Sequence, residues 1–279
     1  MKKCLVTGAN GMLGQDLCPI LEANGYQVIR TDVAEMDITN SSEVEKVIST
    51  EKPDVVIHCA AYTNVDKAEE DIELARLINK TGSENIAKAC AKNDCIMVCI
   101  STDYVFDGEL RNGPYKPTDK TAPLNNYGLT KWEGEEAVRN YCSKHYIIRT
   151  SWLYGIHGKN FVETMISLAD KPELKVVNDQ VGCPTWTVEL AKGILKLLKT
   201  KEYGIHHVCG SGQTSWYEFA KEIFKQANVN VNLKPCTTEE FPRLAKRPVY
   251  SVMFNNKICR DWKESLKDYF KLRENKEKI

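Results

Sequence analysis

The sequence predicts an α/β fold, with a doubly wound parallel β-sheet in the first part of the chain and a smaller α/β unit after it. Two observations lead to this class. Up to residue 150, short apolar segments alternate with segments of helical periodicity. The apolar segments are nearly continuous, which is typical of parallel strands covered by helices on both faces. Right-handed crossovers would then place helices on both sides of one sheet.

The first elements follow from apolar spacing and one glycine. Residues 4–6 form an apolar run that ends in glycine-rich sequence, so a strand is expected there. Residues 12–23 have helical periodicity, and Gly25 follows them as a helix-ending glycine. Residues 26–30 predict the second strand.

The rest of the first half continues the alternation. Ser41 or Ser42 is expected to cap a helix over residues 41–49, and Pro53 introduces a strand over 54–58. The further expected elements are a helix over 68–91, a strand over 95–100, a helix over 126–142 and a strand over 146–148.

The pattern loosens after Arg149, where Pro184, Pro235, Pro242 and Pro248 interrupt the chain. Helices are expected over 189–198 and 216–227, and a strand over 206–209. The tail from Lys271 is charged and is expected to be solvated or frayed.

The composition excludes several classes of protein. Lys and Arg together number 38, as do Asp and Glu, so the net charge is zero and binding to nucleic acid or to a membrane surface is not expected. No segment approaches the ~20 apolar residues of a membrane span. The 11 cysteines are scattered without a C-x-x-C pair, which indicates reduced thiols in a cytoplasmic protein.

A glycine-rich turn near the N-terminus predicts a phosphate-binding site. Gly8, Gly11 and Gly14 follow an apolar strand and open an amphipathic helix. Glycines let the backbone approach a pyrophosphate, and the helix N-terminus offers N–H groups and a positive dipole. An ordinary glycine-rich turn is the alternative reading. The residues expected to contact a dinucleotide here are Gly8, Asn10, Gly11, Met12 and Leu13.

Residues at the ends of the second and third strands extend this site. Asp32 can hydrogen-bond the adenosine ribose, which favours NADH because a carboxylate repels a 2′-phosphate. Arg30 is close enough to offset that repulsion, so both NADH and NADPH remain expected cofactors. The other residues expected around the cofactor are Asp37, Ile38, Cys59, Ala60, Ala61 and Tyr62.

The chain therefore divides into two expected domains. Residues 1–150 form a dinucleotide-binding domain of the Rossmann type, to which strands near 175–178 and 205–209 return. Residues 151–279 form mainly a substrate-binding domain.

A tyrosine and a lysine carry the expected chemistry. Tyr127 and Lys131 lie four residues apart, on one face of the expected helix. A free tyrosine has a pKa of ~10, and an ammonium one turn away would lower that pKa and make the phenol a better acid–base group. Residues 101–104, Ser-Thr-Asp-Tyr, follow the fourth strand, and one hydroxyl among them can hydrogen-bond a substrate carbonyl. A run rich in Ser and Asp at a strand end is also typical of an ordinary turn.

Taken in order, these motifs resemble the extended short-chain dehydrogenase/reductase family over essentially the whole chain. Five further segments narrow the resemblance: C-A-A-Y-T-N-V-D-K-A-E (59–69), S-T-D-Y-V-F-D-G (101–108), R-T-S-W-L-Y-G (149–155), D-Q-V-G-C-P-T (179–185) and R-P-V-Y-S-V (247–252). They are similar to the members of that family that reduce a 4-keto nucleotide sugar, dTDP-4-dehydro-L-rhamnose, at C4.

The resemblance implies a role for each group of residues. Thr102, Tyr127 and Lys131 would be the catalytic residues, and Tyr127 and Lys131 would also bind the cofactor. Substrate contacts are implied for Thr102, Asp103, Tyr104, Trp152, Asn160 and Arg247. Some relatives form a metal-bridged dimer near the positions of Asp16 and Glu189, but two acidic residues are usually solvated, so no metal is expected.

Two other functions stay open. A related group of proteins acts as the regulatory subunit of methionine adenosyltransferase, although the complete Thr102, Tyr127 and Lys131 set argues against that role. An epimerase, or a reductase acting on a different nucleotide sugar, would keep the same fold. The expected partner is a nucleotide sugar, and the protein is expected to be a monomer or a homodimer.

Overall fold

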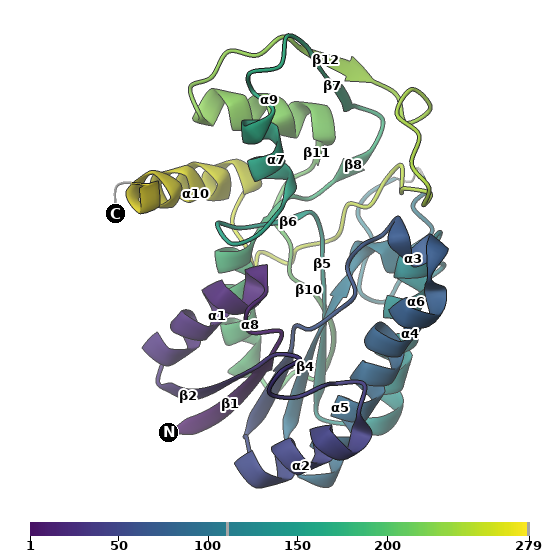
Figure 1. Cartoon of the computed structure of the whole chain (residues 1–279), viewed down its shortest axis with the longest axis vertical. Coiled ribbons are helices and arrows are strands. Elements are labelled where there is room, and N and C mark those ends of the chain that lie inside the picture. The colour runs from purple at the N-terminus through teal and green to yellow at the C-terminus, as the bar shows by residue number, and fades with distance from the viewer. Residues whose placement is uncertain (110–111, 278–279) are drawn as a thin grey trace.

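A six-stranded parallel sheet forms the lower part of the molecule in Figure 1, a computed structural model that describes residues 1–109 and 112–277. The strand order is β10-β5-β4-β3-β1-β2, and every neighbouring pair runs parallel. The strands are β1 (Lys2–Thr7), β2 (Tyr26–Thr31), β3 (Val55–His58), β4 (Ile96–Thr102), β5 (His145–Thr150) and β10 (Gly204–His207). The predicted α/β fold with a doubly wound parallel sheet is confirmed.

Helices cover both faces of the sheet because the strand side chains alternate between them. Cys4 and Val6 of β1 face one core, and Leu5 between them faces the other. The first core is covered by α1 (Met12–Ala23) and α8 (Thr187–Leu198). The opposite face is covered by α2 (Ser41–Glu51), α5 (Gly82–Lys92) and α6 (Asn126–Tyr141).

Two local expectations on this side of the sheet are wrong. The single helix expected over 68–91 is divided into α3 (Lys67–Glu70), α4 (Ile72–Arg76), the π-helix η1 (Leu77–Thr81) and α5. The break comes at Asp71, whose backbone leaves the helical region and whose side chain caps α4 by accepting from the Leu74 N–H. The cap of α2 is Asn40, which precedes the two serines expected there.

The upper part of the molecule has an aromatic core of its own. It contains α7 (Phe161–Ser167), α9 (Trp216–Gln226), α10 (Trp262–Glu277) and the parallel pair of β7 (Leu174–Val177) with β12 (Leu233–Cys236). Two further short pairs join β6 (Leu153–Tyr154) to β9 (Thr185–Trp186), and β8 (Val181–Gly182) to β11 (Thr214–Ser215). A 3₁₀ turn, η2 (Asp103–Val105), follows β4.

Of the two later strands expected to join the large sheet, one does and one does not. β10 pairs with β5 and completes the large sheet, as expected for 205–209. β7, expected near 175–178, does not return to it, because Leu174 and Val176 pack into the aromatic core of the upper part. The charged tail after Lys271 is solvated, as expected, since Lys271 and Glu274 are exposed, and α10 continues through it to Glu277. The division of function near residue 150 stays a prediction.

The packing of α6 gives a test of the fold. A Cβ added at Gly134 would clash with the backbone oxygen of Asn79 in η1. We expect Gly134→Ala to lower the free energy of unfolding by about 1–3 kcal/mol, because the clash with rigid backbone outweighs the better helix propensity of alanine. Urea denaturation measures the change.

Gly193→Ala in α8 is the matched control, because its Cβ would meet side-chain methyls of Val208 and Ile258. A smaller loss is expected for this control. A Gly134→Ala protein as stable as the wild type would contradict the close contact between α6 and η1.

Candidate active site

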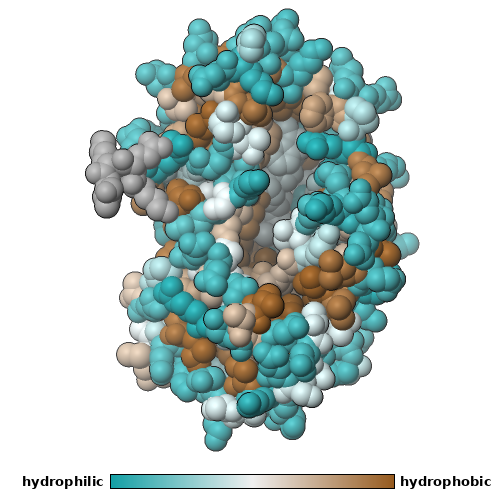
Figure 2. All heavy atoms as spheres, viewed as in Figure 1, coloured by the Kyte–Doolittle hydropathy of each residue, from teal (hydrophilic) through white to brown (hydrophobic). Residues whose placement is uncertain are grey.

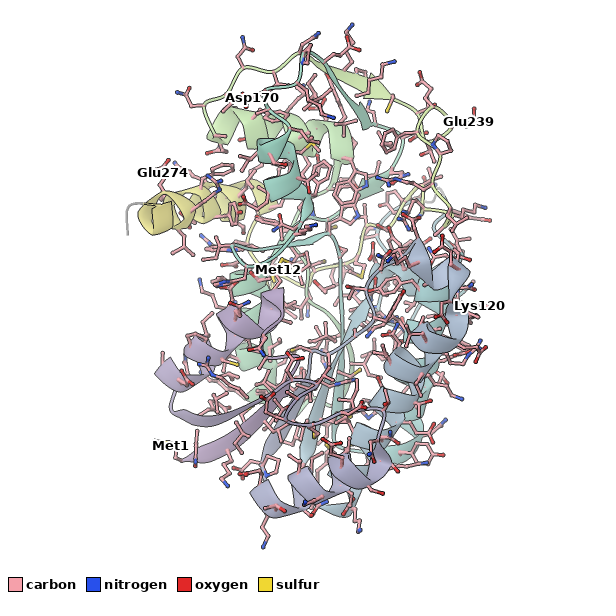
Figure 3. The ribbon with its side chains drawn as sticks, viewed as in Figure 1. Met1, Met12, Lys120, Asp170, Glu239 and Glu274 are labelled. Atoms are coloured by element: carbon pink, nitrogen blue, oxygen red, sulfur yellow. The ribbon has the colours of Figure 1, made fainter. Side chains whose placement is uncertain are left out.

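Two connected cavities lie at the carboxyl ends of the strands. The chain reverses its direction of strand addition between β1 and β3, and ligands of doubly wound sheets bind outside the strand ends at such a point. Figure 2 shows the molecule hollowed between its upper and lower parts, and Met12 at the start of α1 lies at this level in Figure 3. The cavities measure about 430 and 540 Å³, and Cys59 and Ala61 line both.

The first cavity contains the glycine turn. Gly8 has a left-handed φ of +62°, and a Cβ there would lie 2.8 Å from the Ala60 nitrogen, so only glycine fits between β1 and β3. Gly11 precedes α1 and offers no side-chain cap, which leaves the first N–H groups of the helix free to bind an anion. The turn and the helix therefore form a cradle that fits a pyrophosphate.

An acidic group lies beside this cradle. The Asp32 carboxylate accepts from the Asn10 and Val33 backbone N–H groups. Arg30 points toward α1 instead, where its guanidinium lies 2.9 Å from Glu22. The predicted residues that line the first cavity are Gly8, Gly11, Asp32, Asp37, Ile38, Cys59, Ala60 and Ala61. The sequence reasoning missed its exposed apolar rim, which is made of Val33, Leu74 and Leu77.

The second cavity contains the tyrosine and the lysine. Asn125 caps α6 by accepting from the Gly128 N–H, and Tyr127 and Lys131 follow on the cavity side of the helix. The Lys131 ammonium donates to the Ile100 carbonyl at 2.7 Å. The predicted residues that line this cavity are Met12, Leu13, Cys59, Ala61, Thr102, Asp103, Tyr104, Tyr127, Lys131 and Trp152.

The protonation of Tyr127 differs from the expectation. Its ring is partly exposed to the cavity, yet the protein packed around the phenol raises its pKa to about 12, and a hydrogen bond with Thr102 offsets only part of this rise. Lys131 is not among the groups that shift this pKa: its ammonium donates to the Ile100 carbonyl, and its charge acts instead on His58 and Cys59, where it favours lower pKa values. Tyr127 is therefore a neutral phenol that holds its proton at physiological pH.

Thr102 and Asp103 form a second polar pair beside this phenol. The Thr102 hydroxyl accepts from the Tyr104 N–H and donates to the Asp103 carboxylate at 3.0 Å. Asp103 is 2% exposed, and burial raises the pKa of its carboxyl to about 6. A buried hydroxyl and a buried carboxylate thus face the same cavity as Tyr127.

A pair of tryptophans forms a wall of the second cavity. Trp152 stacks on Trp216 with ring centroids 3.5 Å apart, and Trp152 has a left-handed φ of +46°. Such a backbone conformation costs ~1–3 kcal/mol for a bulky residue and is typical of binding sites. Trp216 was not predicted, because it begins a helix far along the chain and no motif there marks it.

Four predicted residues do not line either cavity. Asn10 lies in the glycine turn, and the side chain of Asn79 holds the backbone of Tyr62. Asn160 caps α7, and its amide donates to the Gly155 carbonyl. Arg247 lies behind Tyr104, where its guanidinium lies 3.0 Å from Asp66. Ligand contacts for these four residues stay predictions.

The acidic residues considered for a metal have partners within the chain. Thr187 and His157 lie beside the Asp16 carboxylate, and Arg260 lies 3.0 Å from Glu189. Within the described ranges, no three His, Cys, Asp or Glu side chains gather as metal ligands would. The described helices are likewise too short or too polar to cross a bilayer.

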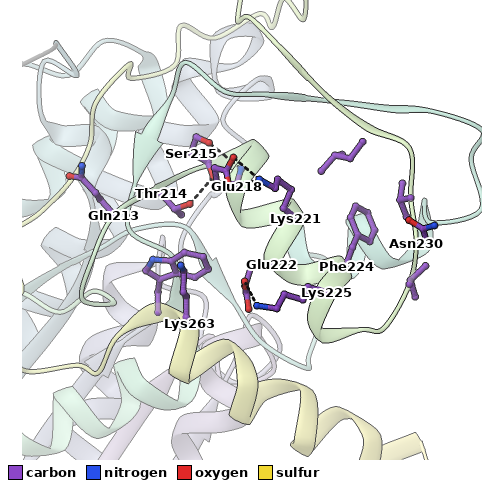
Figure 4. Close-up of a pocket in the computed structure, with 14 residues that line it drawn as sticks. Gln213, Thr214, Ser215, Glu218, Lys221, Glu222, Phe224, Lys225, Asn230 and Lys263 are labelled. Carbon is purple, nitrogen blue, oxygen red and sulfur yellow. Dashed lines mark hydrogen bonds and ion pairs between the residues drawn. The ribbon is translucent and has the colours of Figure 1, made fainter.

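A separate hollow of about 700 Å³, which Tyr127 does not line, lies beside α9. Figure 4 shows the residues around it. Two pairs of its charged side chains are ion pairs, Lys221 with Glu218 and Lys225 with Glu222. None of the predicted site residues lines it, so the two cavities at the sheet edge are the candidate active site.

Comparison with known proteins finds relatives along the whole chain. Residues 1–274 match the family described as "RmlD substrate binding domain". The spore coat polysaccharide biosynthesis protein SpsK of Bacillus subtilis is 41% identical over 280 residues, which cover 98% of each chain. A solved dTDP-4-dehydrorhamnose reductase of Clostridium acetobutylicum is 50% identical, covers 98% of this chain and 99% of that one, and has a TM-score of 0.95.

A second solved structure is informative about the cofactor. The dTDP-4-dehydrorhamnose reductase of Bacillus anthracis was solved in complex with NADP. It is 43% identical to this chain, covers 98% of it and 100% of its own length, and has a TM-score of 0.95.

The buried carboxyl of Asp103 gives a pH-dependent test. Its pKa of about 6 lies above the ordinary 3.8, so ionisation of the folded protein costs stability. The cost is absent below pH ~4, grows through pH 6 and is complete above it, where it reaches ~3 kcal/mol. We expect Asp103→Asn to be more stable than the wild type above pH 6, with the difference vanishing near pH 4.

Urea denaturation across this pH range measures the difference, with the exposed Asp170→Asn variant as the control. A stability gain for Asp103→Asn that is the same at pH 4 and at pH 7 would contradict the assignment.

Proposed function

This chain belongs to the RmlD substrate-binding domain family, and we propose that it reduces the C4 ketone of dTDP-4-dehydro-L-rhamnose to dTDP-L-rhamnose with NADH or NADPH. This is the last step of dTDP-rhamnose biosynthesis. The observation that carries the proposal is the single cavity that holds a protonated Tyr127, Thr102 and Lys131 and opens into the glycine cradle.

The cradle fits a dinucleotide. The free N–H groups at the start of α1 and the close approach allowed by Gly8 suit the pyrophosphate, and Asp32 suits the adenosine ribose. Cys59 and Ala61 lie where the two cavities meet, so the cofactor can extend from one into the other. When bound, it supplies the hydride that is added to the carbonyl carbon.

The residues of the second cavity handle the proton. As negative charge develops on the carbonyl oxygen, the Tyr127 phenol donates its proton to that oxygen. A pKa of about 12 keeps the phenol protonated before the reaction, as a proton donor must be. The Thr102 hydroxyl can turn from Asp103 to donate to the same oxygen, and Lys131, one helical turn from Tyr127 on the cavity side, can bind the cofactor.

The walls of the cavity suit a nucleotide sugar. The Asp103 carboxylate can accept hydrogen bonds from sugar hydroxyls, and the Trp152–Trp216 stack offers an apolar face and excludes water. We also propose a cytoplasmic location, which the free state of all 11 cysteines supports. Absence of nucleic-acid binding and a monomeric or homodimeric state remain parts of the proposal.

The central test is removal of the Tyr127 hydroxyl. We expect Tyr127→Phe to lower kcat by roughly 10²–10⁴, the usual contribution of general acid catalysis, with little change in cofactor affinity. The assay supplies dTDP-4-dehydro-L-rhamnose, made in situ from dTDP-glucose, and follows NADH and NADPH oxidation by absorbance. Tyr217→Phe, in α9, is the matched control.

Turnover of Tyr127→Phe near that of the wild type would refute the assignment of the acid. If the protein oxidised the cofactor only with another 4-keto sugar, the proposed substrate would be wrong. No oxidation with any nucleotide sugar, together with co-purification of a methionine adenosyltransferase, would favour the regulatory role. Tightly bound NAD without net consumption would indicate an epimerase.

The pairing of Arg30 gives a test of cofactor preference. Because Glu22 holds its guanidinium, Arg30 does little to offset Asp32. We expect Glu22→Ala to free Arg30 and to strengthen NADPH relative to NADH by about two- to fivefold, the effect of an exposed ion pair worth up to ~1 kcal/mol. Fluorescence titration gives both Kd values. The control is Glu51→Ala, which removes the surface pair with Lys3, and an unchanged ratio in Glu22→Ala would contradict the prediction.

A further inference from the structure

Successive residues at the end of β4 are held by successive turns of α6. The Lys131 ammonium donates to the carbonyl of Ile100 at 2.7 Å. One residue further along the strand, the Ser101 hydroxyl donates to the carboxylate of Glu135 at 2.5 Å. Lys131 and Glu135 are one helical turn apart, so the helix and the strand are joined at two adjacent points.

Glu135 has a second, charged partner. Arg149 of β5 donates from Nε and Nη2 to the two carboxylate oxygens at 2.9 and 2.6 Å. Ser101 and Arg149 are direct neighbours in the β4–β5 register, so both side chains reach Glu135 from the same face of the sheet. A bidentate pair of this kind fixes relative geometry as well as contributing energy.

Stability alone does not account for this pair. Glu135 and Arg149 are 1% and 2% exposed, and the cost of desolvating two charges offsets most of their attraction. Neither residue lines the active-site cavities. Their location does bear on the site, because Ser101 immediately precedes Thr102, and Glu135 continues the helix face that carries Tyr127 and Lys131.

We propose that Glu135, held by Arg149 and linked to Ser101, is a positioning residue for the reduction. The network fixes the position of α6 against β4. Tyr127 then stays beside Thr102, and Lys131 stays one helical turn from Tyr127 on the cavity side. This inference rests on the proposed function, because it assigns the network to the reaction that Tyr127 and Thr102 carry out. A misplacement of about 1 Å in such a site can cost about 10²-fold in rate.

Two variants separate positioning from folding. Ser101→Ala removes the link to β4 and leaves the ion pair intact. The double variant Glu135→Leu/Arg149→Met replaces the pair by apolar side chains, a change that is often neutral or stabilising, whereas Glu135→Leu alone would leave a buried unpaired charge. Ser265→Ala is the matched control, because Ser265 is also buried but donates to the Asp261 carbonyl just before α10, and it lines neither cavity.

The first measurements are the melting temperature, kcat, KM, and the Kd of NADPH. We expect kcat to fall about tenfold in Ser101→Ala and about 10²-fold in the double variant, with KM and Kd within about twofold of wild type. The double variant should melt no lower than wild type. A folded double variant with kcat within twofold of wild type, or an equal fall in kcat in Ser265→Ala, would overturn the proposal.

The second measurement does not depend on activity. Amide hydrogen exchange over residues 126–135 should be about tenfold faster in Ser101→Ala and in the double variant than in Ser265→Ala, because α6 loses its attachment to β4. Unchanged exchange would overturn the positioning network. If the wild type oxidises no cofactor with this nucleotide sugar, the proposed function fails, and exchange still decides whether the network holds α6.

Discussion

The close approach of β1 and β3 is the constraint on which the rest of the site depends. The two strands are neighbours in the sheet, and the turn after β1 passes so near the turn after β3 that a Cβ at Gly8 would lie 2.8 Å from the Ala60 nitrogen. Gly11, in the same turn, has no side chain to cap α1, so the first N–H groups of the helix are uncapped at the sheet edge. The close approach also places Cys59 and Ala61 between the two cavities, so that a cofactor held by the turn can reach the residues of β4 and α6.

Burial then decides the protonation of two groups that line the second cavity. The same packing that holds α6 on the sheet desolvates Tyr127 and Asp103 and raises the pKa of both. For a reductase this effect is favourable, since the phenol must hold a proton until charge develops on the carbonyl oxygen. The expectation that Lys131 would lower the pKa of Tyr127 considered the helix without the protein packed around it. In the fold, the Ile100 carbonyl orients the ammonium, and desolvation is the larger influence on the tyrosine.

The sequence predicted features that depend on near neighbours in the chain. The bounds of α1 and the helix-ending Gly25 were found from periodicity and glycine chemistry, and strand-end residues such as Thr102 and Asp32 do line the cavities. Contacts between distant segments could not be read in this way. The stack of Trp216 on Trp152, the anchoring of Arg247 by Asp66 and the pairing of β7 with β12 each join residues far apart in sequence. The misplaced cap of α2 has a different cause, since Asn40 and Ser41 are both good caps and the chain geometry chose the first.

The site gathers local features that are unfavourable on their own. Trp152 has a left-handed backbone, Asp103 is a buried carboxyl, and Glu135 with Arg149 is a buried ion pair. Each opposes folding unless its surroundings compensate, and such features cluster where a function requires them. The compensation here is local: Trp216 stacks on Trp152, Thr102 donates to Asp103, and the two charges neutralise each other. The two apolar cores on either face of the sheet therefore provide the stability of the fold. The carboxyl ends of the strands, which face the upper part of the molecule, hold the unfavourable features that the proposed reaction requires.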